Sequence, residues 1–324
     1  MVNVSQLPVI VLNGPTASGK TELAVALAHA LGQPAEVVNA DSMLVYRGMD
    51  IGTAKPGLAE RGGVPHHLID IMDITDEASV AEFQALARAA IADCRARGAI
   101  PVLVGGSALY VRAILDEFEF PSTDPAVRAK WEQRLAEVGS ERLHAELAAL
   151  SPEAAAGILP GNGRRIVRAL EVVELTGSFR STIPAGKYAV ENVIQFGLEL
   201  PRPEMDARIA IRVERMWQRG FPAEVEALLG RGLRQGRTAS RAIGYRQLIA
   251  YFDGELTLPE AKEQTAIRTR QFSRKQLSWF RRDPRIVWVA AGPAAVTELV
   301  ALIGKLSPAT SSLGGHQVIG RRDG

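Results

Sequence analysis

Residues 14 to 21 read GPTASGKT and match the phosphate-loop pattern G-x-x-x-x-G-K-[ST]. An apolar run, Leu7 to Leu12, precedes the motif and an apolar, alanine-rich segment, Glu22 to Leu31, follows it, which predicts a strand, a loop and a helix. Small residues let backbone N–H groups converge on phosphate oxygens, and the helix directs its positive dipole end at the anion. The residues expected to bind phosphate are Gly14, Pro15, Thr16, Ala17, Ser18, Gly19, Lys20 and Thr21.

Short apolar runs alternate with helical patterns through the first hundred residues. Ser79 and Glu82 form a capping box that begins a helix over Val80 to Arg97. A further glycine turn, Gly105-Gly106, ends a buried run and opens another helix. The expected strands are Ala35 to Asn39, His66 to Ile71 and Ile100 to Val104. This alternation predicts an α/β fold, a P-loop NTPase-like parallel sheet flanked by helices.

The pattern changes after Pro121, where no strand is expected before about Gly177. The expected helices there are Pro125 to Val138, Ser140 to Leu150, Pro152 to Ile158 and Gly163 to Leu175. Strands return at Val193 to Leu200 and Ile286 to Val289, separated by helices at Pro203 to Arg219, Pro222 to Arg231, Ser240 to Phe252 and Leu258 to Phe280. We therefore expect an α/β core at 1–118 and 192–306, an inserted all-helical domain at 119–191 and a flexible tail at 307–324.

Charge and cysteine content bound the class of protein. The net charge is only +2, but the segment from Arg231 to Arg285 holds 13 Lys or Arg against 5 Asp or Glu, so any affinity for nucleic acid is local. Cys94 is the only cysteine, which excludes an intrachain disulfide and a cysteine-based zinc finger. The sequence offers no signal-peptide pattern and no apolar run of membrane-spanning length. A soluble, cytoplasmic protein is expected.

Two residues at the presumed ligand edge of the sheet could carry chemistry. Asp41 follows the second strand, where a carboxylate could act as a general base or lie near a metal. Ser107 follows Gly105-Gly106, where its hydroxyl could bond a phosphate. Each could equally cap a helix or turn, which for an isolated Asp is the commoner role.

Other polar residues are weaker candidates. His66 and His67 point apart if they lie in a strand, and no third ligand lies at metal spacing, so we expect them to pack or hydrogen-bond. Thr21 is the better metal contact, because a diphosphate held by Lys20 would bring Mg²⁺ with it.

Basic residues gather in two regions of the second half of the chain. Arg164 and Arg168 are one turn apart on an expected helix, where they could contact phosphate or form a solvated face. In the C-terminal helices, basic residues alternate with aromatics such as Trp279 and Phe280, a pattern that suits single-stranded RNA. The aromatic residues could equally anchor the helix in the core.

Taken together, these segments resemble the tRNA dimethylallyltransferase family, of the bacterial type. The matching blocks lie in order from about residue 8 to residue 290. They are the phosphate loop, NADS at 39–42, YRGMDIGTAKP at 46–56, VGGSALY at 104–110, RRIVRALEV at 164–172, AIGYRQ at 242–247 and TRQFSRKQLSW at 269–279. So many ordered blocks do not arise by chance.

The resemblance implies transfer of a dimethylallyl group from its diphosphate to N6 of adenosine 37, beside the anticodon, in tRNAs that read codons starting with U. The phosphate loop would then hold a diphosphate leaving group, with Mg²⁺ at Thr21. Asp41 would be the general base, which reverses the preference for a cap. Ser107 and Arg128 would flank the reacting base. Family members usually carry Thr at the position of Ser107, so the hydroxyl is kept and the methyl group is lost.

By the same resemblance the partner is the anticodon stem-loop of tRNA, bound by a monomer, and no membrane is involved. The target base would leave the loop stack and enter a channel shared with the prenyl group. The residues implied to contact tRNA are Asp41, Ser42, Met43, Leu44, Ser107, Arg128, Arg164, Arg165, Ile166, Val167, Arg168, Arg241, Ala242, Ile243, Gly244, Tyr245 and Arg246.

Three alternatives stay open on sequence alone. An adenylate isopentenyltransferase shares the loop and the Asp but acts on a free nucleotide, and it needs no long basic surface. A small-molecule phosphotransferase would consume ATP. A non-catalytic RNA-binding protein would leave the phosphate loop idle.

Overall fold

The computed structural model describes residues 7–117, 120–121, 123–179 and 186–306 and divides the chain into two compact units. The first unit is formed by Met1–Asp116 with Tyr188–Gly324, and the second is the intervening segment Glu117–Lys187. The sequence placed the insertion at 119–191, and the expected tail at 307–324 lies outside the described residues.

The first unit is built on a six-stranded sheet in the order β3-β2-β4-β1-β5-β6. Every pairing between these described strands is parallel. The strands are β1 (Val9–Asn13), β2 (Ala35–Asn39), β3 (His66–His67), β4 (Ile100–Gly105), β5 (Val193–Glu199) and β6 (Ile286–Ala290). The parallel sheet predicted from the alternating pattern is confirmed.

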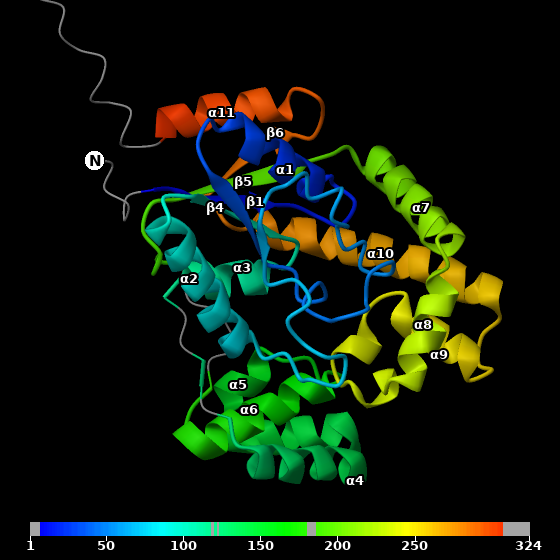
Figure 1. Cartoon of the computed structure of the whole chain (residues 1–324). Helices are drawn as coiled ribbons and strands as arrows, with labels where there is room; N and C mark the ends of the chain where they lie inside the picture. The colour runs from blue at the N-terminus through cyan, green and yellow to red at the C-terminus, as the bar shows by residue number, and fades with distance from the viewer. Residues whose placement is uncertain (1–6, 118–119, 122, 180–185, 307–324) are drawn as a thin grey trace, which may run out of the picture. The chain divides into compact units, whose positions relative to one another are not determined.

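Helices cover both faces of the sheet (Figure 1). They are α1 (Lys20–Ala30), α2 (Val80–Ala96), α3 (Ala108–Leu115), α7 (Arg202–Gln218), α8 (Phe221–Gly230), α9 (Tyr245–Phe252), α10 (Leu258–Phe280) and α11 (Ala295–Leu306). Successive residues of β1 serve opposite faces: Val9 and Val11 pack with α2 and α3, whereas Ile10 and Leu12 pack with α1 and α11. Burial on both faces explains the continuous apolar run of this strand.

Two elements differ from the sequence prediction. The strand expected over His66 to Ile71 is only two residues long, because Leu68 and Asp70 take left-handed backbone angles, with φ of 63° and 58°. Helix α11 was not anticipated, although Ala295, Leu299 and Ile303 recur at helical spacing and are buried.

The second unit is helical, as predicted, and consists of α4 (Pro125–Leu150), α5 (Pro152–Ala156) and α6 (Gly163–Thr176). Helix α4 breaks at Gly139, whose φ is 77°, so it corresponds to the two helices expected on either side of that residue. A Cβ atom on Gly163 would lie 2.8 Å from the side chain of Leu135, so the absence of a side chain there lets α6 approach α4 closely. Among the described residues, no helix combines the length and apolarity needed to cross a membrane.

Candidate active site

The carboxyl ends of three neighbouring strands bring the predicted site residues together. The phosphate loop follows β1, Asp41 follows β2, and the Gly105-Gly106 turn ends β4. The backbone N–H of Ala40 donates to the carbonyl of Val104 at 2.8 Å. A Cβ atom on Gly105 would lie 2.8 Å from that of Ala40, so this glycine lets the two loops meet. Ligands of parallel α/β sheets bind at this edge.

The phosphate loop has the backbone of an anion cradle. Ala17 and Gly19 have left-handed angles, with φ of 68° and 87°, which turn successive N–H groups inward. Helix α1 begins at Lys20 without a side-chain cap, so its first N–H groups are available to an anion. The Lys20 ammonium donates to the carbonyl of Pro15 at 2.7 Å, which holds it over the loop.

The charge environment of Lys20 is tuned by its neighbours. Burial lowers the pKa of Lys20 to about 8, with Asp41 opposing the shift and Arg212 adding to it. A bound diphosphate would reverse this shift, because an adjacent anion favours the ammonium. The loop therefore carries a lysine whose charge depends on what it binds.

Asp41 is held by its neighbours in the chain. Its backbone N–H donates to the Asn39 side-chain oxygen at 2.8 Å, and the Asn39 amide donates to the carbonyls of Asp41 and Leu68 at 2.9 and 3.0 Å. One carboxylate oxygen of Asp41 accepts the N–H of Met43 at 2.9 Å. The capping role weighed from the sequence is thus present, and the second oxygen accepts no hydrogen bond from the described residues. Asn39 was not recognised as a positioning residue.

Arginines of α7 complete the cationic side of the site, and no sequence motif marked them. Arg212 is close enough to Lys20 to act on its charge, and it donates to the Thr53 carbonyl at 2.9 Å. Burial lowers the pKa of Arg212, and Asp41 opposes this shift. One turn earlier, the Arg208 guanidinium lies 3.7 Å from the position that a Cβ atom on Gly19 would take. In the sequence, only the i, i+4 spacing of Arg208 and Arg212 indicated that the two side chains could lie on one face of a helix.

Gln276 of α10 connects the two glycine-containing turns. Its side-chain oxygen accepts from the backbone N–H and the hydroxyl of Thr16 at 2.9 and 3.1 Å. Its amide nitrogen donates to the Gly106 carbonyl at 2.7 Å. A Cβ atom on Gly106 would lie 2.6 Å from this nitrogen, which explains the second glycine of the turn. The sequence placed Gln276 in a matching block but gave it no role.

Ser107 and Thr21 present hydroxyl groups at the same edge. Ser107 occupies the N-cap position of α3, yet its side chain makes no capping hydrogen bond, so its hydroxyl is available to a ligand. Thr21 lies in the first turn of α1 beside Lys20. A hydroxyl next to phosphate oxygens suits Mg²⁺, which prefers hard oxygen ligands, so Thr21 fits the ion that the sequence suggested.

The residues of the first unit that are expected to contact tRNA differ in their solvent exposure. Arg241 and Arg246 are exposed and line a surface pocket of about 470 Å³ with Arg234, Ser240, Ile249 and Asp253. Ala242 and Tyr245 are buried, and the Tyr245 hydroxyl donates to Glu224 at 2.6 Å. Their side chains are therefore part of the core, and a contact of this segment with tRNA stays a prediction. Ser42, Met43, Leu44 and Ile243 are partly exposed, and Gly244 is buried.

The same division holds in the second unit. Arg164 and Arg165 are exposed, whereas Ile166 and Val167 are core residues, and the contact of this segment with tRNA stays a prediction. Arg128 and Arg168 both form ion pairs with the buried carboxylate of Glu171, at 3.6 and 2.8 Å. Both guanidinium groups are thus paired with the same buried carboxylate, and the Arg168 contact is a charge-assisted hydrogen bond.

Helix α10 resolves the question about its aromatic residues. Its buried face carries Thr265, Thr269, Ser273, Gln276 and Phe280. Trp279 is instead 48% exposed, and the Arg282 guanidinium lies 5.5 Å from its ring centre. The outer face presents the basic residues Arg268, Arg274, Lys275, Arg281 and Arg282 to solvent. Phe280 is therefore a core anchor, and Trp279 belongs to the basic, aromatic surface.

Comparisons with known proteins identify the family of the chain. Residues 44–283 match the family model described as IPP transferase. A curated tRNA dimethylallyltransferase of Kineococcus radiotolerans is 60% identical over 290 residues, which cover 88% of this chain and 91% of the relative. The solved tRNA isopentenylpyrophosphate transferase of Bacillus halodurans is 38% identical with a TM-score of 0.70, covering 95% of this chain and 99% of that one. A eukaryotic dimethylallyltransferase solved acting on tRNA is 25% identical with a TM-score of 0.74, covering 92% and 78%.

Proposed function

The chain belongs to the IPP transferase family, and on this basis we propose that it transfers a dimethylallyl group from dimethylallyl diphosphate to N6 of an adenosine in tRNA. The observation that carries the chemistry is the position of Asp41. Asn39 holds it at the edge of the sheet that also bears the phosphate loop, and its charge acts on Lys20. A proton acceptor and an anion cradle thus share one site.

The phosphate loop holds the leaving group. Its N–H groups, Lys20 and Arg212 offset the negative charge that grows on the diphosphate as the carbon–oxygen bond breaks. Mg²⁺, held by the Thr21 hydroxyl and the diphosphate oxygens, would supply further charge stabilisation there. This use of the loop needs no nucleoside triphosphate.

Asp41 serves the acceptor. The N6 lone pair attacks C1 of the dimethylallyl group, the diphosphate departs with the electrons of the C1–O bond, and the Asp41 carboxylate takes a proton from N6. The adenine amine is a weak nucleophile because its lone pair is delocalised, so both alignment and proton removal contribute to the rate. The Ser107 side chain makes no capping hydrogen bond with α3, so its hydroxyl is available to orient the base.

We further propose that the acceptor is adenosine 37 of tRNAs that read codons starting with U. The protein would bind the anticodon stem-loop as a monomer, in the cytoplasm. The basic outer face of α10 and the exposed Arg241 and Arg246 support an extended RNA acceptor over a free nucleotide. The names of the curated relatives point the same way.

A competition assay tests this function. Labelled dimethylallyl diphosphate and Mg²⁺ are incubated with unmodified tRNA, the same tRNA carrying guanosine at position 37, or AMP. We expect label in the first acceptor alone. Label in AMP at a comparable rate would make the protein an adenylate isopentenyltransferase, and label in the guanosine-37 tRNA would contradict the assigned position.

A further inference from the structure

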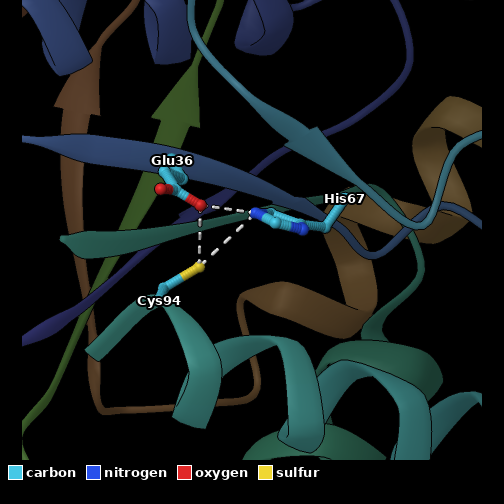
Figure 2. Close-up of side chains that lie close together, drawn as sticks. All are labelled: Glu36, His67 and Cys94. Atoms are coloured by element: carbon cyan, nitrogen blue, oxygen red, sulfur yellow. Dashed lines mark hydrogen bonds and ion pairs between the residues drawn. The ribbon is translucent and has the colours of Figure 1, made fainter. Parts of the chain in front are cut away.

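Three potential metal ligands from separate elements converge on one point (Figure 2). Glu36 lies near the start of β2, His67 forms part of β3, and Cys94 lies near the end of α2. His67 Nε2 is 2.6 Å from Glu36 Oε2, and Cys94 Sγ lies 3.4 Å from that oxygen and 3.6 Å from His67 Nε2. The three ligand atoms lie within 4.8 Å of one another.

Sequence spacing concealed this cluster. The expectation of packing or hydrogen-bonding histidines is met, since His66 contacts the Val64 carbonyl at 2.8 Å and His67 contacts Glu36. The other two potential ligands, however, lie far from His67 in the sequence: Glu36 is 31 residues before it and Cys94 is 27 residues after it. Pairing of Val38 with His67 places β3 beside β2, and α2 packs on the same face of the sheet.

Without a cation, these groups form a hydrogen-bonded cluster. Burial and the adjacent Glu36 raise the pKa of Cys94 to about 12, so the thiol stays protonated and donates to the carboxylate. An Arg97 nitrogen also contacts Glu36 Oε2 at 2.6 Å. One carboxylate oxygen therefore faces three donors, and a divalent cation could replace two of them.

We propose that Glu36, His67 and Cys94 form a binding site for a divalent transition metal of the Zn²⁺ class. Thiolate, imidazole and carboxylate are the ligands that Zn²⁺ takes in proteins. With ordinary zinc–ligand bond lengths, tetrahedral geometry puts the sulfur about 3.6 Å from each of the other two ligand atoms. The observed separations of 3.6 and 3.4 Å fit this geometry. The distance between His67 Nε2 and Glu36 Oε2 would have to increase by about 0.8 Å to fit the same tetrahedral geometry.

Binding balances charge and protons. Cys94 releases its proton to solvent, so thiolate and carboxylate neutralise the dication while His67 binds as neutral imidazole. The side chains of His67 and Glu36 are 26% and 13% exposed, which leaves a path for the ion and room for a water as fourth ligand. Arg97 keeps its second contact, with Asp93.

The location indicates a structural role. Glu36 lies near the start of β2, whereas Asn39, at the end of the same strand, holds Asp41. The metal would join the two-residue edge strand β3 to β2 and α2. We therefore expect the ion to stabilise the short strand β3 and to take no direct part in group transfer.

Cobalt substitution tests the site on the full chain after chelation and desalting. Because Cys94 is the only cysteine, any thiolate-to-cobalt charge-transfer absorption must come from it. We expect one Co²⁺ per chain with tetrahedral d–d bands, displacement by Zn²⁺, release of one proton, and loss of the signal in Cys94→Ser. Glu36→Gln and His67→Gln should weaken binding by more than about tenfold, whereas the matched control His29→Gln, on the exposed end of α1, should bind normally.

Two results would overturn the site. The first is a wild-type protein that unfolds cooperatively yet gives no charge-transfer absorption at saturating Co²⁺. The second is wild-type affinity in both Glu36→Gln and His67→Gln, which would reduce the signal to a lone thiol. These readouts do not depend on whether Cys94→Ser folds. As a further check, Zn²⁺ should raise the melting temperature of the wild type more than that of His67→Gln, and an equal rise would contradict the proposal.

Discussion

The side-chain oxygen of Gln276 accepts a hydrogen bond from the backbone N–H of Thr16 at 2.9 Å, although the two residues are separated by 260 positions in the chain. The same side chain donates to the Gly106 carbonyl at 2.7 Å. Helix α10 is thus joined directly to the phosphate loop and to the turn that carries Ser107. Its opposite face carries the basic residues proposed to bind RNA, so one helix would link acceptor binding to the proposed diphosphate site.

Gln276→Ala is expected to lower kcat/KM for dimethylallyl diphosphate by about tenfold or more, because both turns lose the contact that fixes them. The unpaired buried groups should also cost about 1–3 kcal/mol of stability. Steady-state kinetics and thermal unfolding measure the two effects. Gln271→Ala, at an exposed position of the same helix, serves as the matched control. Lost stability with unchanged kcat/KM would reduce Gln276 to a purely structural residue.

The lowered pKa of Lys20 predicts how donor binding changes with pH. Below about 8 the side chain is an ammonium, and above it the free protein loses this charge, so KM for the diphosphate should rise as pH increases through that value. Because the unfolded chain holds the proton up to the ordinary pKa of 10.5, this group's contribution to folding stability should also increase between these values. In Lys20→Arg the rise in KM should disappear, and a rise that persists would assign it to another group.

Arg212→Ala should weaken binding of the donor and shift that pH profile. Loss of a charged hydrogen-bond donor costs about 1.5–3 kcal/mol, which corresponds to a ten- to hundredfold rise in KM. Arg212 also helps to lower the pKa of Lys20, so its removal should move the increase in KM to higher pH. Arg215→Ala, exposed on the same helix, is the control. An unshifted profile would place Arg212 outside the electrostatics of the loop.

Replacement of Arg274 and Lys275 by Ala should weaken tRNA binding and flatten its salt dependence. Each lost phosphate contact lowers the slope of log K against log salt by about 0.7–0.9. Lys305→Ala, exposed on α11, removes a charge elsewhere and should leave the slope unchanged. Filter binding of an anticodon stem-loop over a salt series provides the measurement. If the double variant keeps the wild-type slope, this face of α10 does not contact RNA.

Local patterns predicted the parts of the molecule that local residues determine. The phosphate loop was visible because its strand, glycines and helix are consecutive, and Gly139 divides α4 where the sequence divided two helices. Helix α11 was missed although its apolar spacing is regular and it carries Glu298 in its first turn and Lys305 in its last.

Contacts between segments that are far apart in the chain could not be predicted from the sequence. Gln276 meets Thr16, and Cys94 meets His67, only after the sheet has formed and the helices have packed on it. Tyr245 stood in an arginine-rich motif that favoured an RNA contact, but its hydroxyl pairs with Glu224 and its ring is buried. A motif gives the residue types of a surface, whereas tertiary packing decides which of them reach solvent.

In the proposed reaction Asp41 removes the proton from the attacking amine, and the variant Asp41→Asn isolates this step. Asparagine keeps an oxygen for the N–H of Met43 and leaves the backbone contacts to Asn39 in place, so the loop should keep its shape. Single-turnover transfer of labelled dimethylallyl groups to tRNA, measured beside tRNA affinity, separates chemistry from binding. We expect the transfer rate to fall by about 10²- to 10⁴-fold with affinity unchanged. An equal loss of affinity and rate, or a rate close to wild type, would contradict the role of Asp41 as the base.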